Sequence, residues 1–321
     1  MTDPGQDYAD KKFDEIVKRI HKVYTAANRD IVERLDAHAK RMLVEDELKR
    51  GRVEEGTMTE KAYRKWLNGQ VYRSKLWKEQ TASITSTLLD ANRAANRIIE
   101  GERRAVFGEN ASYQAYQLER GAGMDLSFTV YDSATVTRLL RDDPGLLPKK
   151  TVNGPVDRRW NEKKITAIVT RGIVSGASIP EIADMLKEEL GSSNEKAMTR
   201  YARTAMTGAQ NAGRMEVLHE AQAMDIKVKK VWLATLDHRT RPAHQHLDGQ
   251  VQDVDDPFES DLGPIMYPGD PAADEANTWN CRCTLTYEYE EYPREAGGRY
   301  DNEAREDIED MTYDEWKEWA G

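Results

Sequence analysis

The sequence has little of three things that define common protein classes: cysteine, aromatic residues and long apolar runs. Only two of its 321 residues are cysteine, and a single residue separates them, so they cannot form a disulfide framework. Aromatic residues make up 8% of the chain, charged residues make up 32%, and the mean hydropathy is −0.79. A secretory apolar segment and an apolar run of membrane-spanning length are both absent. We therefore expect a protein of a reducing cytoplasm with a modest core, rich in solvated helix and without a membrane partner.

The net charge of −10 is distributed unevenly. Residues 253–321 hold 21 acidic and five basic residues, a balance of −16, which leaves +6 for residues 1–252. A mildly basic body with an acidic tail is typical of a protein that touches nucleic acid or pairs charge with a neighbour. Non-specific DNA is thus one expected partner, through the basic residues Arg158, Arg159, Lys163, Lys164 and Arg171.

Residues 1–121 are predicted to form a helical region. Apolar residues recur at steps of three and four over residues 13–42, and no proline follows Pro4 in this stretch. Such a stripe predicts a long amphipathic helix.

A break at Gly51–Gly56 separates this helix from a second one. Thr57 and Glu60 have the spacing of a capping box, and the apolar positions that follow predict a helix to about residue 99. Two helices joined by so short a break indicate an antiparallel hairpin.

Residues 122–159 are interpreted as a connecting segment, with a helix from about Ser133. A compact domain over residues 160–290 then begins with a helix over 162–174, which Gly176 ends. Ser178 and Glu181 form a second capping box, which opens the next helix.

A further helix is predicted between residues 192 and 223. It carries a series of small residues that would let another helix approach closely: Ala202, Ala205, Gly208, Ala209, Ala212 and Gly213. Glycine lowers helix stability by about 1 kcal/mol relative to alanine, so close packing is the expected reason for the glycines.

Two strands are predicted to enclose an unusually long loop. Residues 227–234 and 283–289 alternate apolar and polar positions, whereas prolines and glycines punctuate residues 249–271 too often for a helix or a sheet. Loops of this length usually carry a function or are tethered.

This loop holds the motifs that resemble the phage head morphogenesis family, the Mu F-like minor head proteins. The resemblance covers about residues 160–288. It rests on Trp232, on the run Asp237-x-Arg239-Thr240-Arg241-x-x-His244, on Leu247-Asp248-Gly249, on Tyr267-Pro268-Gly269-Asp270-Pro271 and on Asn280-Cys281-Arg282-Cys283. A helix containing Arg203 to Met206 and Asn211 to Arg214 resembles the family's lead-in to these motifs.

The resemblance implies a minor head protein of a tailed phage or prophage, present in few copies. Such a protein would lie in the virion, in the head interior or at the portal vertex, after assembly in the host cytoplasm. The implied partners are the portal protein and other head or scaffold proteins. We expect no enzyme in residues 291–321, an acidic tail with a short helix capped by Thr312, because it is too short and too acidic for the toxin or ADP-ribosylating domain that some relatives carry.

The motif residues also allow a metal site. Many family members have Cys-x-x-Cys where this chain has Arg241-x-x-His244, and with the later cysteines that pattern resembles a zinc knuckle. Here zinc could be held by His244, Cys281 and Cys283, with His238, His246 or Asp237 as fourth ligand. Against zinc, the Cys-x-Cys spacing is tighter than structural sites usually show.

A buried polar clasp is the favoured alternative to a metal. Asp237 with Arg282, or Asp248 with Arg239, would tie the loop to the strand through bidentate ion pairs. Asn280 would hydrogen-bond to the backbone where the loop rejoins the sheet. In this reading the cysteines are small buried residues and the motif determines the fold.

A third reading makes the motif a catalytic group. A cysteine beside His244 or His246 would form a thiolate–imidazole pair, as in a cysteine-dependent enzyme domain of a phage-encoded effector. The expected fold is the same in all three cases: an α+β protein, predominantly α-helical, with long N-terminal helices and a compact C-terminal domain of helices and a small antiparallel sheet.

Overall fold

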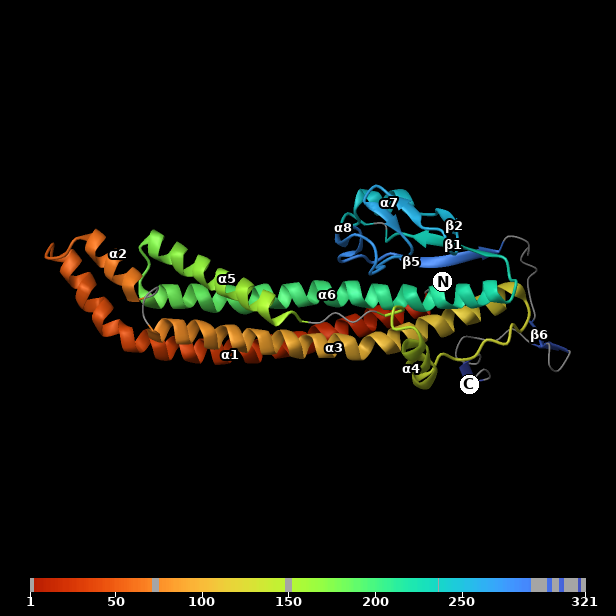
Figure 1. The fold of residues 1–321 in the computed structure, drawn as a ribbon, viewed down its shortest axis with the longest axis horizontal. Coiled ribbons are helices and arrows are strands. Elements are labelled where there is room, and N and C mark those ends of the chain that lie inside the picture. The colour runs from red at the N-terminus through yellow and green to blue at the C-terminus, as the bar shows by residue number, and fades with distance from the viewer. Residues whose placement is uncertain are drawn as a thin grey trace. The chain divides into compact units, whose positions relative to one another are not determined.

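The computed structural model describes residues 3–70, 75–147, 152–235, 237–289, 299–301, 306–308 and 317–318. It is predominantly α-helical with small antiparallel sheets, which confirms the expected fold class (Figure 1). The predicted capping residue Thr312 lies outside the described residues.

Three long helices dominate the described chain: α1 (Pro4–Glu54), α3 (Lys75–Ala122) and α6 (Ile179–Ala223). At the start of α1, Asp3 accepts a hydrogen bond from the backbone N–H of Gln6 at 3.0 Å, and Pro4 stands where no N–H is needed. The predicted end of this helix near Gly56 is confirmed, and Gly56 has a φ of 72°.

The chain forms two compact units, and neither is one continuous stretch. Unit 1 comprises Met1–Val17, Ile99–Lys149 and Arg200–Gly321, and unit 2 comprises Lys18–Ile98 and Lys150–Thr199. Each long helix contributes residues to both units. The linear division into residues 1–121, 122–159, 160–290 and 291–321 stays a prediction, separate from these compact units.

Unit 2 packs an apolar core between helical segments. The core draws on α1, α2 (Glu60–Asn68), α3, α5 (Gly154–Ser175) and α6, and contains Ile31, Leu35, Leu67, Ile84, Leu88, Ile168 and Leu186. The predicted second helix to residue 99 is thus divided into α2 and α3. Its cap is Thr59 and not Thr57, because the Thr59 hydroxyl accepts the N–H of Ala62 at 3.2 Å.

The turn between α5 and α6 agrees with the sequence. Gly176 ends α5 with a φ of 78°, and the backbone N–H and hydroxyl of Ser178 both donate to the carboxylate of Glu181. The predicted break near residue 191 is wrong, because α6 is one helix of 45 residues. Gly191 stays helical and makes room for the side chain of Asn28, which an added Cβ would overlap.

Unit 1 contains the predicted pair of strands. Strand β1 (Val228–Leu233) pairs antiparallel with β2 (Val251–Asp253) on one side and with β5 (Thr284–Tyr289) on the other, so the order is β2-β1-β5. In Figure 1 these strands lie over the C-terminal part of α6.

The long loop between β1 and β5 has more regular structure than its prolines and glycines predict. It contains the short helices α7 (Pro242–Leu247) and α8 (Glu275–Thr278). It also contains a hairpin of β3 (Phe258–Ser260) and β4 (Gly263–Ile265). Pro264 fits this hairpin because the strands are only three residues long and β4 pairs on one side.

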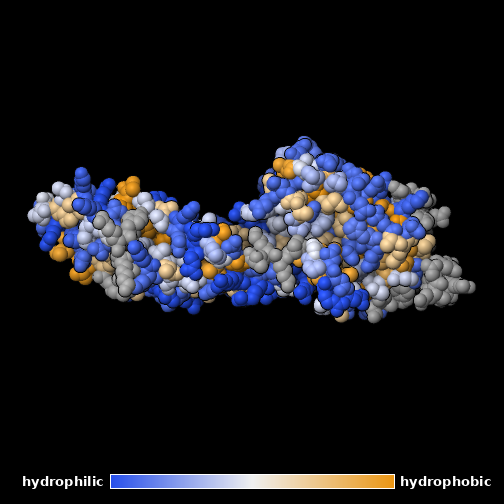
Figure 2. Space-filling model, in the orientation of Figure 1, coloured by the Kyte–Doolittle hydropathy of each residue, from blue (hydrophilic) through white to orange (hydrophobic). Residues whose placement is uncertain are grey.

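The remaining elements are α4 (Ser133–Asp142), β6 (Arg299–Asp301) and β7 (Glu306–Ile308). Helix α4 begins where predicted, with Asp132 as its cap. Among the described helices, none has an apolar stretch that could cross a membrane. The face in Figure 2 is mostly hydrophilic, with apolar residues in scattered places.

Candidate functional site

The predicted ion pair between Asp237 and Arg282 is present. Both terminal nitrogens of Arg282 donate to the Asp237 carboxylate, at 2.6 Å each. The Arg282 side chain is 19% exposed and that of Asp237 is 28% exposed. The Arg282 guanidinium and the backbone N–H of Arg239 hold the pKa of Asp237 well below its usual range. The pair joins the segment after β1 to Arg282, two positions before β5.

The alternative pair, Asp248 with Arg239, does not form. Asp248 instead accepts the backbone N–H of Ala234 at 2.8 Å, and Gly249 follows it with a φ of 75°. Arg239 is 68% exposed and approaches Asp237 at 3.5 Å. Asp248 therefore secures the turn between α7 and β2 and is not part of an ion pair with Arg239.

His244, Cys281 and Cys283 converge in the interior of unit 1. The Nδ1 atom of His244 lies 3.5 Å from each sulfur, and the three possible ligand atoms all lie within 4.8 Å of one another. The three residues are 1%, 3% and 2% exposed. Arg282 stands between the two cysteines in the sequence but binds Asp237. In the run Cys281-Arg282-Cys283, the cysteines therefore face the interior cluster and the arginine forms the ion pair.

The His244 ring is fixed by Asn277. The Asn277 amide nitrogen donates to the Gly263 carbonyl at 2.9 Å, so its oxygen must be the atom 2.9 Å from His244 Nε2. An amide oxygen accepts only, so Nε2 carries the hydrogen and a neutral ring presents its lone pair on Nδ1, toward the two sulfurs. The Trp232 ring packs against the His244 ring in a T-shaped arrangement, with 5.3 Å between the ring centres.

The two thiols share hydrogen bonds and differ in acidity. The thiol of Cys281 donates toward Cys283, which lowers the pKa of Cys283 and raises that of Cys281. His244 and the backbone N–H of Thr235 also favour the Cys283 thiolate. The backbone N–H of Cys283 donates to the Cys281 sulfur at 3.4 Å.

The candidates for a fourth metal ligand lie outside this cluster. Asp237 is engaged by Arg282, His246 faces Asp261 at 3.1 Å with its side chain 72% exposed, and His238 is exposed. Arg241, at the family's first cysteine position, donates to the backbone carbonyls of Asn277 and Trp279. The described part of the chain therefore offers three ligands from protein side chains.

One face of α6 binds the backbone of the motif. Thr207 donates to the Cys281 carbonyl at 2.7 Å, and the Asn211 amide donates to the carbonyls of Pro268 and Cys283 at 3.1 and 3.3 Å. The Asn211 oxygen accepts the N–H of Leu285 at 2.9 Å. The clasp thus includes α6, which the sequence reading identified only as a lead-in helix.

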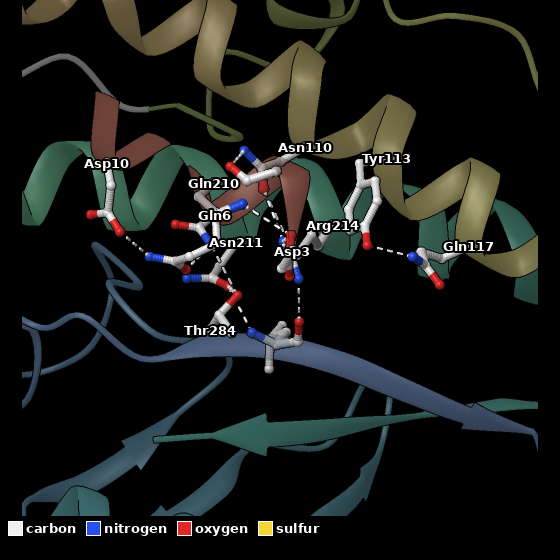
Figure 3. Close-up of polar contacts among 12 residues, drawn as sticks. Asp3, Gln6, Asp10, Asn110, Tyr113, Gln117, Gln210, Asn211, Arg214 and Thr284 are labelled. Carbon is white, nitrogen blue, oxygen red and sulfur yellow. Dashed lines mark hydrogen bonds and ion pairs between the residues drawn. The ribbon is translucent and has the colours of Figure 1, made fainter. Parts of the chain in front are cut away.

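The same face also binds the start of the chain (Figure 3). Arg214 donates to the Leu285 carbonyl at 2.7 Å, to the Asp3 carboxylate at 2.7 and 2.8 Å, and to Asn110 of α3 at 3.2 Å. Gln210 donates to Gln6 and Thr284 at 2.6 and 2.9 Å. These bonds connect α1, α3, α6 and β5 within unit 1.

The Tyr-Pro-Gly-Asp-Pro motif packs directly on α6. A Cβ added at Gly208 would lie 2.7 Å from the Gly269 carbonyl oxygen, and Gly269 itself has a φ of 81°. Asp270 accepts the backbone N–H groups of Met266 and Ala272 at 3.1 and 2.8 Å, which holds the turn. Close packing, the predicted role of the α6 glycines, is confirmed at Gly208.

Asn280 takes the left-handed conformation, with a φ of 57°, and its backbone N–H donates to Thr204 of α6 at 2.9 Å. Asparagine tolerates this region better than most residues. The bond of Asn280 that the structure shows therefore runs from its own backbone to a side chain of α6, and not to the backbone of the sheet as predicted.

Lys230 is a buried cation that sequence reasoning missed. It is 0% exposed, its ammonium donates to the Met266 carbonyl at 2.9 Å and lies 5.2 Å from the Phe258 ring centre. Burial lowers the pKa of Lys230 to about 8. Strand alternation puts Lys230 on the buried face of Val228 and Trp232, although its residue type is polar.

The order thiol, imidazole, amide also occurs in Cys-His-Asn catalytic groups. A substrate carbonyl must reach the sulfur in such an enzyme, and here both sulfurs belong to residues at most 3% exposed. The geometry therefore favours a structural role for the cluster, as the clasp hypothesis predicted.

Comparison with known proteins identifies the class. Residues 163–286 match the family model described as Phage Mu protein F like protein. This match and the similarity to a phage minor head protein confirm the resemblance to the Mu F-like, phage head morphogenesis family.

Two relatives are similar over most of the chain. The minor head protein GP7 of Bacillus phage SPP1 is 27% identical over 328 aligned positions, which cover 99% of this chain and 98% of GP7. The NAD(+)–arginine ADP-ribosyltransferase EFV of Enterococcus faecalis (strain ATCC 700802 / V583) is 31% identical over 279 positions and 79% of this chain, which spans only 55% of that relative. A search of solved structures found no match.

The sequence reading missed several residues that build the site: Asp3, Asn110, Thr207, Asn277 and Lys230. Asn277 stands in a loop with no periodic pattern, and Asp3 and Asn110 are far from the motif in sequence. Only Asn211 and Arg214 carried a signal, because they belong to the lead-in that resembles the family.

Proposed function

We propose that this protein acts in procapsid assembly as a minor head component bound to the portal protein. The observation that carries the proposal is the end-to-end similarity to minor head protein GP7, which leaves almost no part of either chain unmatched. The closed cluster supports a structural role, because the motif residues hold strands, loop and α6 together and do not line an open site.

The portal contact can be tested by co-expression of the chain with the portal protein of its own phage. A stable complex on affinity purification and size-exclusion chromatography is expected. Deletion of the first helix is a poor variant here, because Asp3 and Gln6 are bonded to Arg214 and Gln210 in unit 1. Substitutions on an exposed face are the better choice.

Val44 and Leu48 offer such a face on α1, since they are 73% and 58% exposed and one helical turn apart. The double change V44E/L48E should leave the fold intact and reduce portal binding if α1 makes the contact. The exposed neighbours Glu45 and Glu47, changed to glutamine, provide the matched control. Absence of any complex with the unmodified chain would overturn the portal proposal. Equal binding by both variants would show only that this face of α1 does not contact the portal protein.

The virion location is proposed on the same basis. Mass spectrometry of purified virions and procapsids should find the chain in both, at a small number of copies relative to the major capsid protein. Its presence only in lysate that contains no particles would contradict the proposal.

Non-specific DNA contact is a weaker part of the proposal. Arg171 and Lys164 both face Glu189, the latter pair at 3.8 Å, whereas Arg158, Arg159 and Lys163 are exposed. Binding to duplex DNA should therefore be weak and should fall steeply as salt rises. Failure to bind duplex DNA at low salt would contradict the proposed DNA contact.

Arginine ADP-ribosyl transfer is the second candidate, because the name of the Enterococcus relative raises it. We expect no transfer, since 99% of this chain aligns with minor head protein GP7. Incubation with labelled NAD and an arginine-rich acceptor protein tests it. Label transfer by the purified chain would reverse our assignment of a non-enzymatic role.

A further inference from the structure

We propose that His244, Cys281 and Cys283 bind one thiophilic divalent metal ion, zinc in the cell, and that Asn277 positions His244 for it. This inference goes beyond the assembly function and does not depend on it. It specifies three protein ligands, the ring nitrogen that binds, and a positioning residue.

Distances within the cluster suit a tetrahedral ion. Zinc lies about 2.3 Å from sulfur and about 2.0 Å from imidazole nitrogen, so a nitrogen–sulfur edge of the tetrahedron is about 3.6 Å long. Both edges from His244 Nδ1 to the sulfurs of Cys281 and Cys283 are 3.5 Å. An ion could therefore enter with little movement of the three side chains.

Hydrogen bonding at Nδ1 of His244 can engage only one of the two sulfurs at a time. Nδ1 of a neutral His244 has one lone pair, which can accept one thiol hydrogen. Two sulfurs stand at the same distance from it. A metal ion resolves this, because it accepts the lone pair of the nitrogen and those of both sulfurs at once.

Asn277 provides the support that metal-binding histidines usually have. A ligating histidine almost always donates its other ring N–H to a fixed acceptor, which sets the tautomer. Asn277 accepts from Nε2 at 2.9 Å, and its own amide is fixed by the Gly263 carbonyl. Asn277 is 0% exposed, so the orientation is held inside the core.

The surroundings favour sulfur ligands. The backbone N–H of Cys283 donates to the Cys281 sulfur at 3.4 Å, and hydrogen bonds of this kind stabilise thiolates. With three protein ligands, the fourth position is left for a water molecule. The indole N–H of Trp232, whose ring packs on His244, is buried without a hydrogen-bond partner among the described residues and could donate to such a water.

The metal would stabilise the attachment of the loop to α6. The carbonyl of Cys281 accepts from Thr207, and that of Cys283 accepts from Asn211. Fixing both cysteines therefore also fixes two hydrogen bonds to α6, so binding free energy contributes to folding of unit 1.

The competing interpretation is a metal-free thiol–imidazole group with the same contacts. The two are separated by titration of the untagged, chelator-treated full chain with cobalt, whose tetrahedral thiolate complexes absorb strongly in the near ultraviolet and visible regions. Saturation at one cobalt per chain, with thiolate-to-cobalt charge transfer, is expected. Zinc should then displace the cobalt and raise the Tm.

Variants locate the site. Cys281→Ser, Cys283→Ser and His244→Ala should each abolish stoichiometric binding, and Asn277→Ala should weaken it by about 10- to 100-fold. Asn277→Asp, which keeps an acceptor for Nε2, should recover part of the affinity. His246→Ala is the matched control, because this histidine is exposed and outside the cluster.

Folded wild type that shows no cobalt charge transfer and retains no zinc after equilibration with excess metal would overturn the proposal. So would full binding by the Cys281→Ser variant. Because the cobalt titration uses the unmodified chain, it decides the matter even if the variants do not fold. Portal binding by the metal-free chain is a separate measurement, so failure of the metal site leaves the assembly function standing.

Discussion

Arg214 and Asp3 are 211 positions apart in the sequence, yet a terminal nitrogen of the arginine lies 2.8 and 2.7 Å from the two carboxylate oxygens. The Arg214 side chain is 3% exposed and that of Asp3 is 32% exposed. The start of the chain is thus bound to the interior face of α6.

Arg214→Ala should lower the free energy of unfolding by about 3 kcal/mol, because the Leu285 carbonyl and the Asn110 amide oxygen lose a buried donor together with Asp3. Arg214→Lys should recover little, since an ammonium cannot reach all three partners. Asp3→Ala should have a smaller effect, about 1 kcal/mol, because its carboxylate is partly solvated. Urea denaturation of the three variants measures this order, and equal effects of Arg214→Ala and Asp3→Ala would contradict it.

Gly208→Ala should destabilise the protein although alanine is the better helix former. An added Cβ would lie 2.7 Å from the Gly269 carbonyl oxygen, so the loop must move away from α6. Gly101→Ala in α3 is the control, because its Cβ would meet nothing within 4 Å, and it should stabilise by about 0.5–1 kcal/mol. Thermal denaturation should give Tm shifts of opposite sign; two increases would show that the loop is not held against the helix.

Asp237 should contribute to acid stability. Its folded pKa lies below the ordinary 3.8, chiefly because Arg282 binds the carboxylate, so the stabilisation is full above the unfolded pKa. It is lost as the pH falls through the folded pKa. Asp237→Asn should therefore reduce the dependence of unfolding free energy on pH below about 4, and urea titrations at a series of pH values test this. If the unfolding free energy of the variant falls with acid as steeply as that of the unmodified protein, Asp237 does not contribute to acid stability.

Lys230 should also make stability rise with pH, but in the alkaline range and because burial disfavours its charged form. Its folded pKa is lowered from 10.5 to about 8 by burial, so the unfolded chain binds more protons between these values and stability rises with pH there. Lys230→Met should abolish this rise while leaving the Met266 carbonyl without a donor. Comparing the two proteins from pH 7.5 to 9.5 isolates the lysine from other groups, and parallel profiles would show that Lys230 titrates normally.

Local sequence signals predicted local structure well. The stop at Gly176, the capping box of Ser178 and Glu181 and the two alternating strands were read correctly because each depends on residues a few positions apart. The division of the chain into units was not predictable in this way. Asp3, Asn110 and Arg214 form one network across the sequence, and periodicity contains no information about such contacts.

The site was predicted in part for the same reason. The Asp237–Arg282 pair followed from charge types within one motif. The sequence could not choose between it and the alternative Asp248–Arg239 pair, because Asp248 accepts a backbone N–H that its residue type does not reveal. Asn277 could not be found, since its role is defined by His244 and Gly263 and not by its neighbours in the chain.

The discontinuous makeup of unit 1 has a consequence for synthesis of the chain. Asp3 leaves the ribosome early, but its partner Arg214 is made 211 residues later and Leu285 later still. At about 5–20 residues per second, the first helix waits roughly 10–40 s for these partners. During that interval Asp3 and Gln6 lack their partners on α6, so the part of α1 in unit 1 is completed only after most of the chain has been made.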